Sequence, residues 1–134
     1  MQRILTRTQF QAAMAGAIVA KTPHFALHRL ALPDPAQGRL LFPVQDTWIG
    51  VVLPKRWARR AVTRNAIRRQ TYEAARAAAD GLPPAALVVR LRSEFSRKQF
   101  VSATSDALKQ AVRAELVQLL GRVTARTTPE VAAC

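Results

Sequence analysis

A long helical segment places the strongest constraint on the fold of this chain. It runs from about Arg60 to Asp80 without a glycine or a proline, and Gly81-Leu82-Pro83-Pro84 then ends it. On a helical wheel, one stripe of this segment carries small or apolar side chains suited to packing on a sheet: Ile67, Thr71, Ala74 and Ala78. We therefore expect the helix to cover a β-sheet formed by the rest of the chain.

Apolar runs bounded by turn residues predict the strands of that sheet. They are HFALHRLAL (24–32), RLLFPV (39–44) and TWIGVVL (47–53) before the helix, and ALVVRLR (86–92) after it. A first helix is expected from a cap at Thr6 or Thr8 to about Gly16, with Phe10, Ala13, Met14 and Ala17 on one face. A last helix is expected from Ser96 to Gly121.

These elements follow the order α-β-β-β-α-β-α, which describes an α/β (α+β) two-layer sandwich. The apolar content of 49% and the length of 134 residues suit one domain with a core of its own. We expect this domain to span residues 1–121 and a flexible C-terminal tail to span 122–134.

The chain is strongly basic, with 21 Lys and Arg residues against 8 Asp and Glu, a net charge of +13 and a pI of about 11.7. Charge this far from zero favours a polyanionic partner, and nucleic acid is the commonest one. The charge is most concentrated in RRAVTRNAIRRQ (59–70), which holds five arginines and starts the long helix. Only Glu73 lies within reach, and it can pair with Arg69 or Arg76 but not with the other arginines. The segment is therefore not a solvated face of alternating charges.

Other classes of function have little support in the residues. The helix face opposite the arginines is too small and polar to bind a membrane, and no apolar run approaches a transmembrane helix. Neither a signal peptide nor a disulfide framework is evident, so a cytoplasmic protein is expected. His24 and His28 lie on a strand without a nearby carboxylate, so we expect no metal site and no catalytic residue in the chain.

Three aromatic residues remain open to two interpretations. Phe10 and Phe25 could stack on unpaired bases, although single apolar aromatic residues are more commonly buried. Trp57, inside the basic segment PKRWARR, could either stack on a base or anchor the loop.

The order of residues around Asn65 resembles the RNR motif of the bacterial ribonuclease P protein family. Lys55 and Arg56 precede AVTRNAIRR (61–69), and this helix start follows the strand sequence IGVV. Weaker matches occur in the right order: R-x-x-F at Arg7 and Phe10, F-x-L at Phe25, and LPPAALVVR after the helix. The resemblance covers roughly residues 3–120.

The resemblance implies a ribosomal-protein-like α/β sandwich with a left-handed βαβ crossover, which is rare. It also implies the accessory protein subunit of an endoribonuclease whose RNA subunit, with Mg²⁺, removes the 5′ leader of precursor tRNA. One protein would bind one catalytic RNA. The alternative is another small basic RNA-binding protein, such as a ribosomal protein or an assembly factor.

Carried over by position, the resemblance predicts two groups of site residues. The group that contacts the catalytic RNA is Lys55, Arg56, Arg59, Arg60, Arg64, Asn65, Arg68, Arg69 and Arg76. The group that lines the leader-binding cleft is Phe10, Met14, Phe25 and His28. Met14 and His28 stand where the family commonly has aromatic residues, so weaker stacking on the leader is expected. Tyr72 replaces a frequent arginine, and Arg76 is expected to supply that charge.

Overall fold

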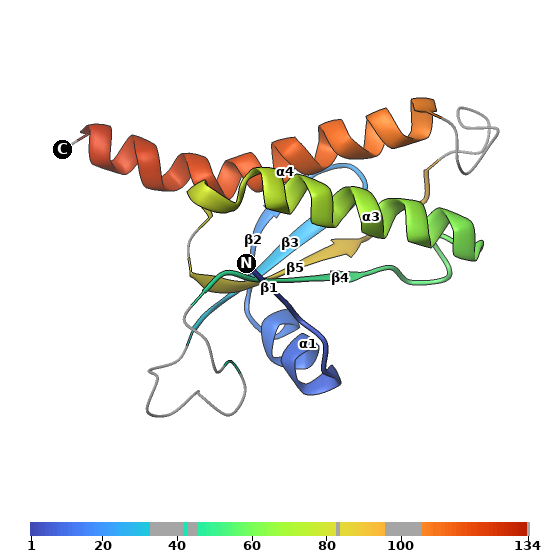
Figure 1. The fold of residues 1–134 in the computed structure, drawn as a ribbon, viewed down its shortest axis with the longest axis horizontal. Helices are drawn as coiled ribbons and strands as arrows, with labels where there is room; N and C mark the ends of the chain where they lie inside the picture. The colour runs from blue at the N-terminus through green and yellow to red at the C-terminus, as the bar shows by residue number, and fades with distance from the viewer. Residues whose placement is uncertain (33–41, 43–45, 83, 96–105, 134) are drawn as a thin grey trace.

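Five strands form one mixed sheet in the computed structural model, which describes residues 1–32, 42, 46–82, 84–95 and 106–133 (Figure 1). The spatial order is β1-β4-β5-β3-β2. The strands are β1 (Gln2–Arg3), β2 (Ala17–Lys21), β3 (Phe25–Ala31), β4 (Trp48–Val52) and β5 (Ala85–Leu91). Strand β4 is parallel to β1 and β5, whereas β3 is antiparallel to β2 and β5.

Helices lie on both faces of the sheet. Helix α3 (Ala61–Ala77) and helix α4 (Asp106–Ala133) cover one face, and α1 (Arg7–Met14) lies on the other (Figure 1). A short 3₁₀ helix, η1 (Ala79–Gly81), follows α3. The predicted α/β fold and long helix are confirmed, and β4-α3-β5 is a parallel βαβ unit. The left-handedness of this unit stays a prediction.

Alternation along the strands separates two apolar cores. Phe25, Leu27 and Leu87 point toward α3 and α4, and they form the larger core with Ile67 and Leu116. The intervening positions point toward α1, where Val88 and Ala86 form a smaller core with Ile4, Ala13, Phe42 and Trp48. The two faces of the sheet therefore carry two separate surfaces of the protein, one formed with α3 and α4 and the other with α1.

Helix α1 begins with a complete capping box. The Thr6 hydroxyl accepts a hydrogen bond from the Gln9 backbone N–H at 3.1 Å, and the Gln9 side chain accepts from the Thr6 N–H at 3.3 Å. Thr6 is therefore the cap, one of the two predicted. The helix ends at Met14 rather than near Gly16, and Ala17 lies in β2, which the sequence did not predict. A Cβ on Gly16 would collide with the Arg29 carbonyl, so glycine permits this early turn into the sheet.

Helix α4 differs from the prediction at its C-terminal end. It continues through Gly121 to Ala133, so the predicted stop is wrong. A glycine inside a helix costs only about 1 kcal/mol, and the buried side chains of Leu119, Leu120 and Val123 hold the helix on the sheet on both sides of it. The predicted mobility of residues 122–134 stays a prediction. The expected cap at Ser96 and the strand at 39–44, apart from Phe42, lie outside the described residues.

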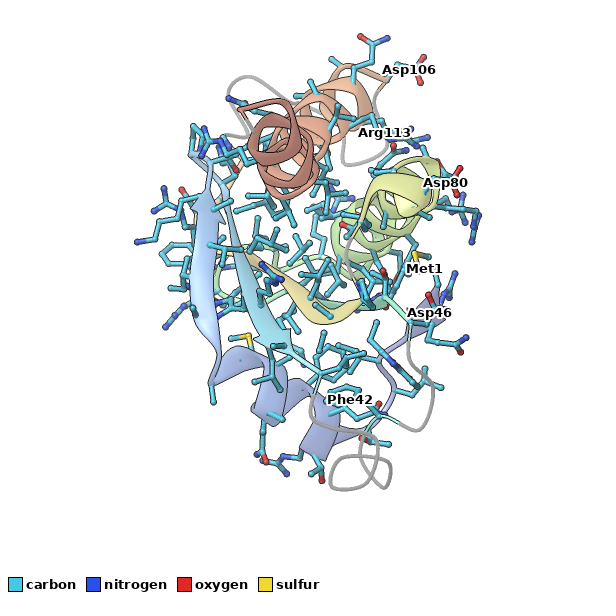
Figure 2. The ribbon with its side chains drawn as sticks, turned by 90° about the vertical axis from the view of Figure 1, so that its left-hand side faces the viewer. Met1, Phe42, Asp46, Asp80, Asp106 and Arg113 are labelled. Carbon is cyan, nitrogen blue, oxygen red and sulfur yellow. The ribbon has the colours of Figure 1, made fainter. Side chains whose placement is uncertain are left out.

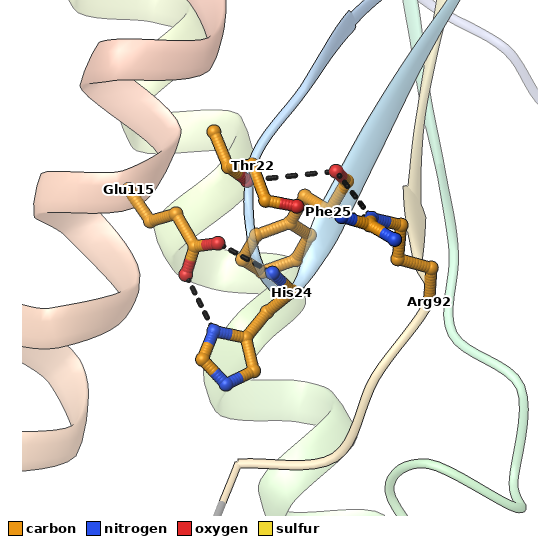
Figure 3. A network of polar contacts seen from close by, with 5 residues as sticks. All are labelled: Thr22, His24, Phe25, Arg92 and Glu115. Carbon is orange, nitrogen blue, oxygen red and sulfur yellow. Dashed lines mark hydrogen bonds and ion pairs between the residues drawn. The ribbon is translucent and has the colours of Figure 1, made fainter.

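The loop between β2 and β3 is tied to α4 by polar contacts (Figure 3). Glu115 accepts hydrogen bonds from the His24 backbone N–H at 2.6 Å and contacts His24 Nδ1 at 2.9 Å. The His24 ring stacks on Phe95, with ring centres 3.9 Å apart. The expectation that His24 lacks a carboxylate partner is therefore wrong, because the partner comes from a helix distant in the sequence.

Candidate nucleic-acid interface

A tight turn leads from β4 into α3 and exposes two cations. The Pro54 carbonyl accepts hydrogen bonds from the backbone N–H groups of Trp57 and Ala58, at 3.0 and 3.2 Å. This turn leaves Lys55 and Arg56 in solvent. Trp57 is half-buried against the larger core, and the Arg56 guanidinium lies 5.2 Å from the centre of its ring. Trp57 therefore anchors the loop by packing.

The first turn of α3 is held by Arg64 rather than by a capping side chain. Arg60 is the N-cap residue and makes no side-chain capping bond. Arg64 Nη1 instead donates to the carbonyls of Ala58 and Arg59, both at 2.9 Å. The guanidinium thus fastens the helix to the preceding turn, while Arg59 and Arg60 stay exposed. Arg64 has a structural role that the sequence reasoning did not assign to it.

The sheet-facing stripe of α3 packs as the helical wheel predicts. Ile67, Thr71 and Ala74 are buried against the sheet, and the Thr71 hydroxyl donates to the Ile67 carbonyl at 2.8 Å. The other predicted RNA-contacting residues of the helix are exposed: Asn65, Arg68, Arg69 and Arg76. Arg68 Nη1 donates to Asn65 Oδ1 at 3.0 Å, which aligns both side chains along the helix.

The acidic residue of α3 pairs with α4 and not with its own helix. Glu73 Oε2 accepts from Arg113 Nη2 at 2.6 Å, and Gln70 Oε1 accepts from Arg113 Nε at 3.0 Å. Arg113 reaches α3 from the neighbouring helix (Figure 2). The predicted pairing of Glu73 with Arg69 or Arg76 is therefore wrong. Within the described part of the chain, neither arginine has an acidic partner.

The exposed side of α3 borders a hollow of about 370 Å³. Its walls are Asn65, Arg68, Arg69, Tyr72, Glu73 and Arg76 of α3, together with Arg3 of β1. The Arg3 guanidinium lies 4.2 Å from the centre of the Tyr72 ring. Sequence reasoning missed Arg3, because a two-residue strand has no periodicity that would place it beside a helix far along the chain.

The predicted leader-binding residues divide between the two faces of the sheet. Phe10 and Met14 are half-buried on the α1 face, where His28 is also located, at 5% exposure. Phe25 is fully buried in the larger core on the opposite face, against Phe95. The structure therefore corrects the expectation for Phe25, which shares no surface with Phe10. Its position in the strand alternation, three residues from His28, places it on the other side.

His28 is held as a neutral imidazole by its surroundings. Burial lowers its pKa, and the nearby Arg90 charge lowers it further. Arg90 Nε donates to His28 Nε2 at 3.0 Å, which leaves the ring proton on Nδ1. The Met14 carbonyl lies close enough to oppose these effects without reaching hydrogen-bond geometry to Nδ1. His28 is thus a neutral polar group beneath α1.

In the described residues, no three His, Cys, Asp or Glu side chains gather in a group that could hold a metal ion. Among the same residues, no helix is long and apolar enough to cross a membrane.

An exposed basic helix, an adjoining basic turn and a five-stranded α/β fold define a small RNA-binding protein. Comparison with known proteins gives the family. The family model for Ribonuclease P matches residues 1–122. The chain belongs to the ribonuclease P protein family, whose members are subunits of an endoribonuclease, bind RNA and act in tRNA processing.

Individual relatives agree with the family model. The ribonuclease P protein component of Bordetella parapertussis is 36% identical over 118 residues, which are 85% of each chain. The component of Ralstonia pickettii is 35% identical over 117 residues, 86% of this chain and 74% of that protein.

Solved structures agree in fold. The RNase P protein of Thermotoga maritima superposes with a TM-score of 0.65 at 20% identity, over 92% of this chain and 98% of that one. The RNase P protein of Staphylococcus aureus also gives 0.65, at 16% identity, over 90% and 93%.

Proposed function

We propose that this protein docks on the ribonuclease P RNA through α3 and its preceding turn, and thereby assists removal of the 5′ leader from precursor tRNA. The RNA subunit performs the hydrolysis with Mg²⁺, and one protein serves one RNA in the cytoplasm. The protein supplies cations, which reduce the repulsion between two RNA molecules.

One observation carries the proposal: the exposed arginines of α3 have no acidic partner on their own helix. Arg68, Arg69 and Arg76 project from one side, and the helix N-terminus adds positive potential to that of Lys55 and Arg56. Arg64 and Arg68 lie one turn apart, and the repulsion between such like charges costs a few tenths of a kcal/mol, so this arrangement lowers helix stability unless an anion is bound. Guanidinium groups bind phosphate in a bidentate geometry, which suits an RNA backbone.

The face covered by α1 is proposed as the surface for the leader. Phe10 and Met14 offer half-buried apolar groups, and His28 and Arg90 lie beneath them as a linked polar pair. A single-stranded leader needs apolar surfaces for its bases and a cation for its backbone. Phe10 is the one aromatic residue among the predicted cleft residues on this face, so stacking on the leader should be weak.

Reconstitution tests the proposal. The protein is added to a bacterial ribonuclease P RNA at low Mg²⁺, and cleavage of precursor tRNA is followed on a gel. Cleavage at the mature 5′ end should increase at least about tenfold over the RNA alone, since cations from the protein replace part of the metal requirement. A folded preparation that gives no stimulation would refute the proposed function.

A matched pair of variants tests the docking surface. Arg68→Gln/Arg69→Gln removes two charges from α3, and Lys21→Gln/Lys109→Gln removes two charges elsewhere. The first variant should reduce the slope of log affinity for the RNA against log salt concentration by about 0.7–0.9 per lost phosphate contact. The second should change it little, and equal effects of the two variants would exclude α3 as the docking helix.

A further inference from the structure

Arg3 occupies a fixed position beside α3 although it is far from that helix in the sequence. The backbone on either side of it is paired to β4: the Gln2 N–H donates to the Thr47 carbonyl and the Ile4 N–H to the Ile49 carbonyl, both at 2.8 Å. Ile4, at 2% exposure, anchors the opposite side of the strand in the smaller core. Because side chains alternate along a strand, Arg3 points toward α3.

The guanidinium of Arg3 is positioned by the Tyr72 ring. It lies 4.2 Å from the ring centre, a cation–π distance. Tyr72 itself is 9% exposed, so the rest of its ring is packed in the core and cannot move away. Burial raises the pKa of the Tyr72 phenol, which opposes ionisation, although Arg3 and Arg68 act in the other direction. Arg3 is thus held over the ring of a neutral tyrosine.

Four arginines line one hollow of about 370 Å³: Arg3, Arg68, Arg69 and Arg76. The one carboxylate in its wall, Glu73, pairs with Arg113 of α4. Asn65 is oriented by its hydrogen bond from Arg68, which leaves its amide N–H₂ as a further donor. Donors and positive charge from two separate elements therefore surround a space that has the size of a small-ligand site.

We propose that this pocket between β1 and α3 binds one phosphate of the RNA backbone, and that Arg3 is an additional RNA-contacting residue. The inference rests on the proposed docking function of α3 and extends it to the N-terminal strand. Arg3 covers the accessible face of the Tyr72 ring, so a base has no aromatic surface to stack on there. The contact is accordingly to phosphate and independent of base sequence.

The single tyrosine of the chain gives a direct probe of the pocket. Tyr72 is the only tyrosine, so incorporation of 3-fluorotyrosine produces one ¹⁹F resonance, located in the pocket wall. Titration of the full chain with inorganic phosphate should shift this resonance saturably. In Arg3→Gln the midpoint should rise at least about fivefold, because a charged donor is lost, whereas Arg3→Lys should fall in between.

The control removes one charge from the opposite edge of the sheet. Lys21 lies on β2, is exposed, and is remote from β1 in the strand order, so Lys21→Gln should leave the midpoint within about twofold of the wild type. A wild-type resonance that does not saturate, or an equal midpoint in Arg3→Gln and wild type, would overturn the pocket. Circular dichroism confirms folding of each variant, which depends on the backbone of β1 rather than on the Arg3 side chain.

RNA binding distinguishes an RNA phosphate from a free anion. The slope of log affinity for ribonuclease P RNA against log salt concentration should become shallower by about 0.7–0.9 in Arg3→Gln. It should stay unchanged in Lys21→Gln. A phosphate response without this loss would mean that the pocket takes a free anion, which contradicts the inference. The phosphate titration uses no ribonuclease P RNA, so it can succeed even if reconstitution of cleavage fails. The two proposals can therefore fail separately.

Discussion

Replacing Arg64 by glutamine separates the structural arginine of the motif from the exposed ones. In the native protein, Arg64 Nη1 satisfies the Ala58 and Arg59 carbonyls at 2.9 Å each. A hydrogen bond from a charged donor contributes about 1.5–3 kcal/mol when it is buried. Arg64 is only half-buried, so water would replace much of this, and we expect a combined loss of about 1 kcal/mol in the free energy of unfolding.

The helix dipole also reduces the loss in the free energy of unfolding that is expected for Arg64→Gln. Arg64 lies in the first part of α3, where a cation is disfavoured by a few tenths of a kcal/mol. Removing the charge recovers that amount, so the net loss stays near 1 kcal/mol rather than 2. For a chain of this length, the midpoint of thermal unfolding should fall by about 3–5 °C.

Urea and thermal unfolding followed by circular dichroism measure this change. Arg69→Gln is the matched control, because Arg69 is exposed and makes no hydrogen bond or ion pair to any described residue. Its stability should stay within about 0.5 kcal/mol of the wild type. If Arg64→Gln proves as stable as Arg69→Gln, the two contacts to the turn contribute nothing, and the structural role assigned to Arg64 is incorrect.

Two further predictions concern packing and pH. Gly50→Ala should lower the free energy of unfolding by about 1–3 kcal/mol, because its Cβ would lie 2.6 Å from Phe10 Cε1. Gly121→Ala should raise the free energy of unfolding by about 0.5–1 kcal/mol, because its Cβ would have nothing within 4 Å. Equal effects of the two variants in urea unfolding would contradict this. His28 has a folded-state pKa below its ordinary value of 6.5, so the unfolded chain takes up the proton first. Its contribution to stability is present above pH 6.5 and is lost as the pH falls from there toward the folded pKa. Thermal unfolding of the wild type between pH 7.5 and 5 should show a steeper loss than His28→Gln, and identical slopes would be inconsistent with a buried neutral imidazole.

The regular parts of the fold could be predicted from local patterns. The helix covering 61–77 and the strands at 25–31, 48–52 and 85–91 follow from side-chain periodicity with glycine and proline at their ends. Strand β2 was missed because AIVAK, with its small residues, continues the apolar spacing of α1. What makes it a strand is its pairing with β3, and such tertiary pairing is not encoded in a short window.

The site residues could likewise be predicted only where they lie on one regular element. The exposed arginines of α3 could be predicted, because they share one helix and their spacing determines which side they face. Arg3, the pairing of Glu73 with Arg113 and the pairing of His24 with Glu115 each join distant segments, so only the folded chain reveals them. Strand alternation predicts that Phe25 and His28 lie on opposite faces of the sheet, whereas the family position of Phe25 predicts a cleft shared with Phe10.

The short pairing between β1 and β4 also affects how the chain opens. Two residues of β1 lie at the edge of the sheet and are held by few hydrogen bonds, so this edge should detach before the central strands unfold. Its amides, such as that of Ile4, should exchange with solvent faster than those of β5, which is flanked by strands on both sides. An anion that binds both Arg3 and α3 would hold β1 against the sheet. Anion binding would therefore slow the exchange of the first amides of the chain.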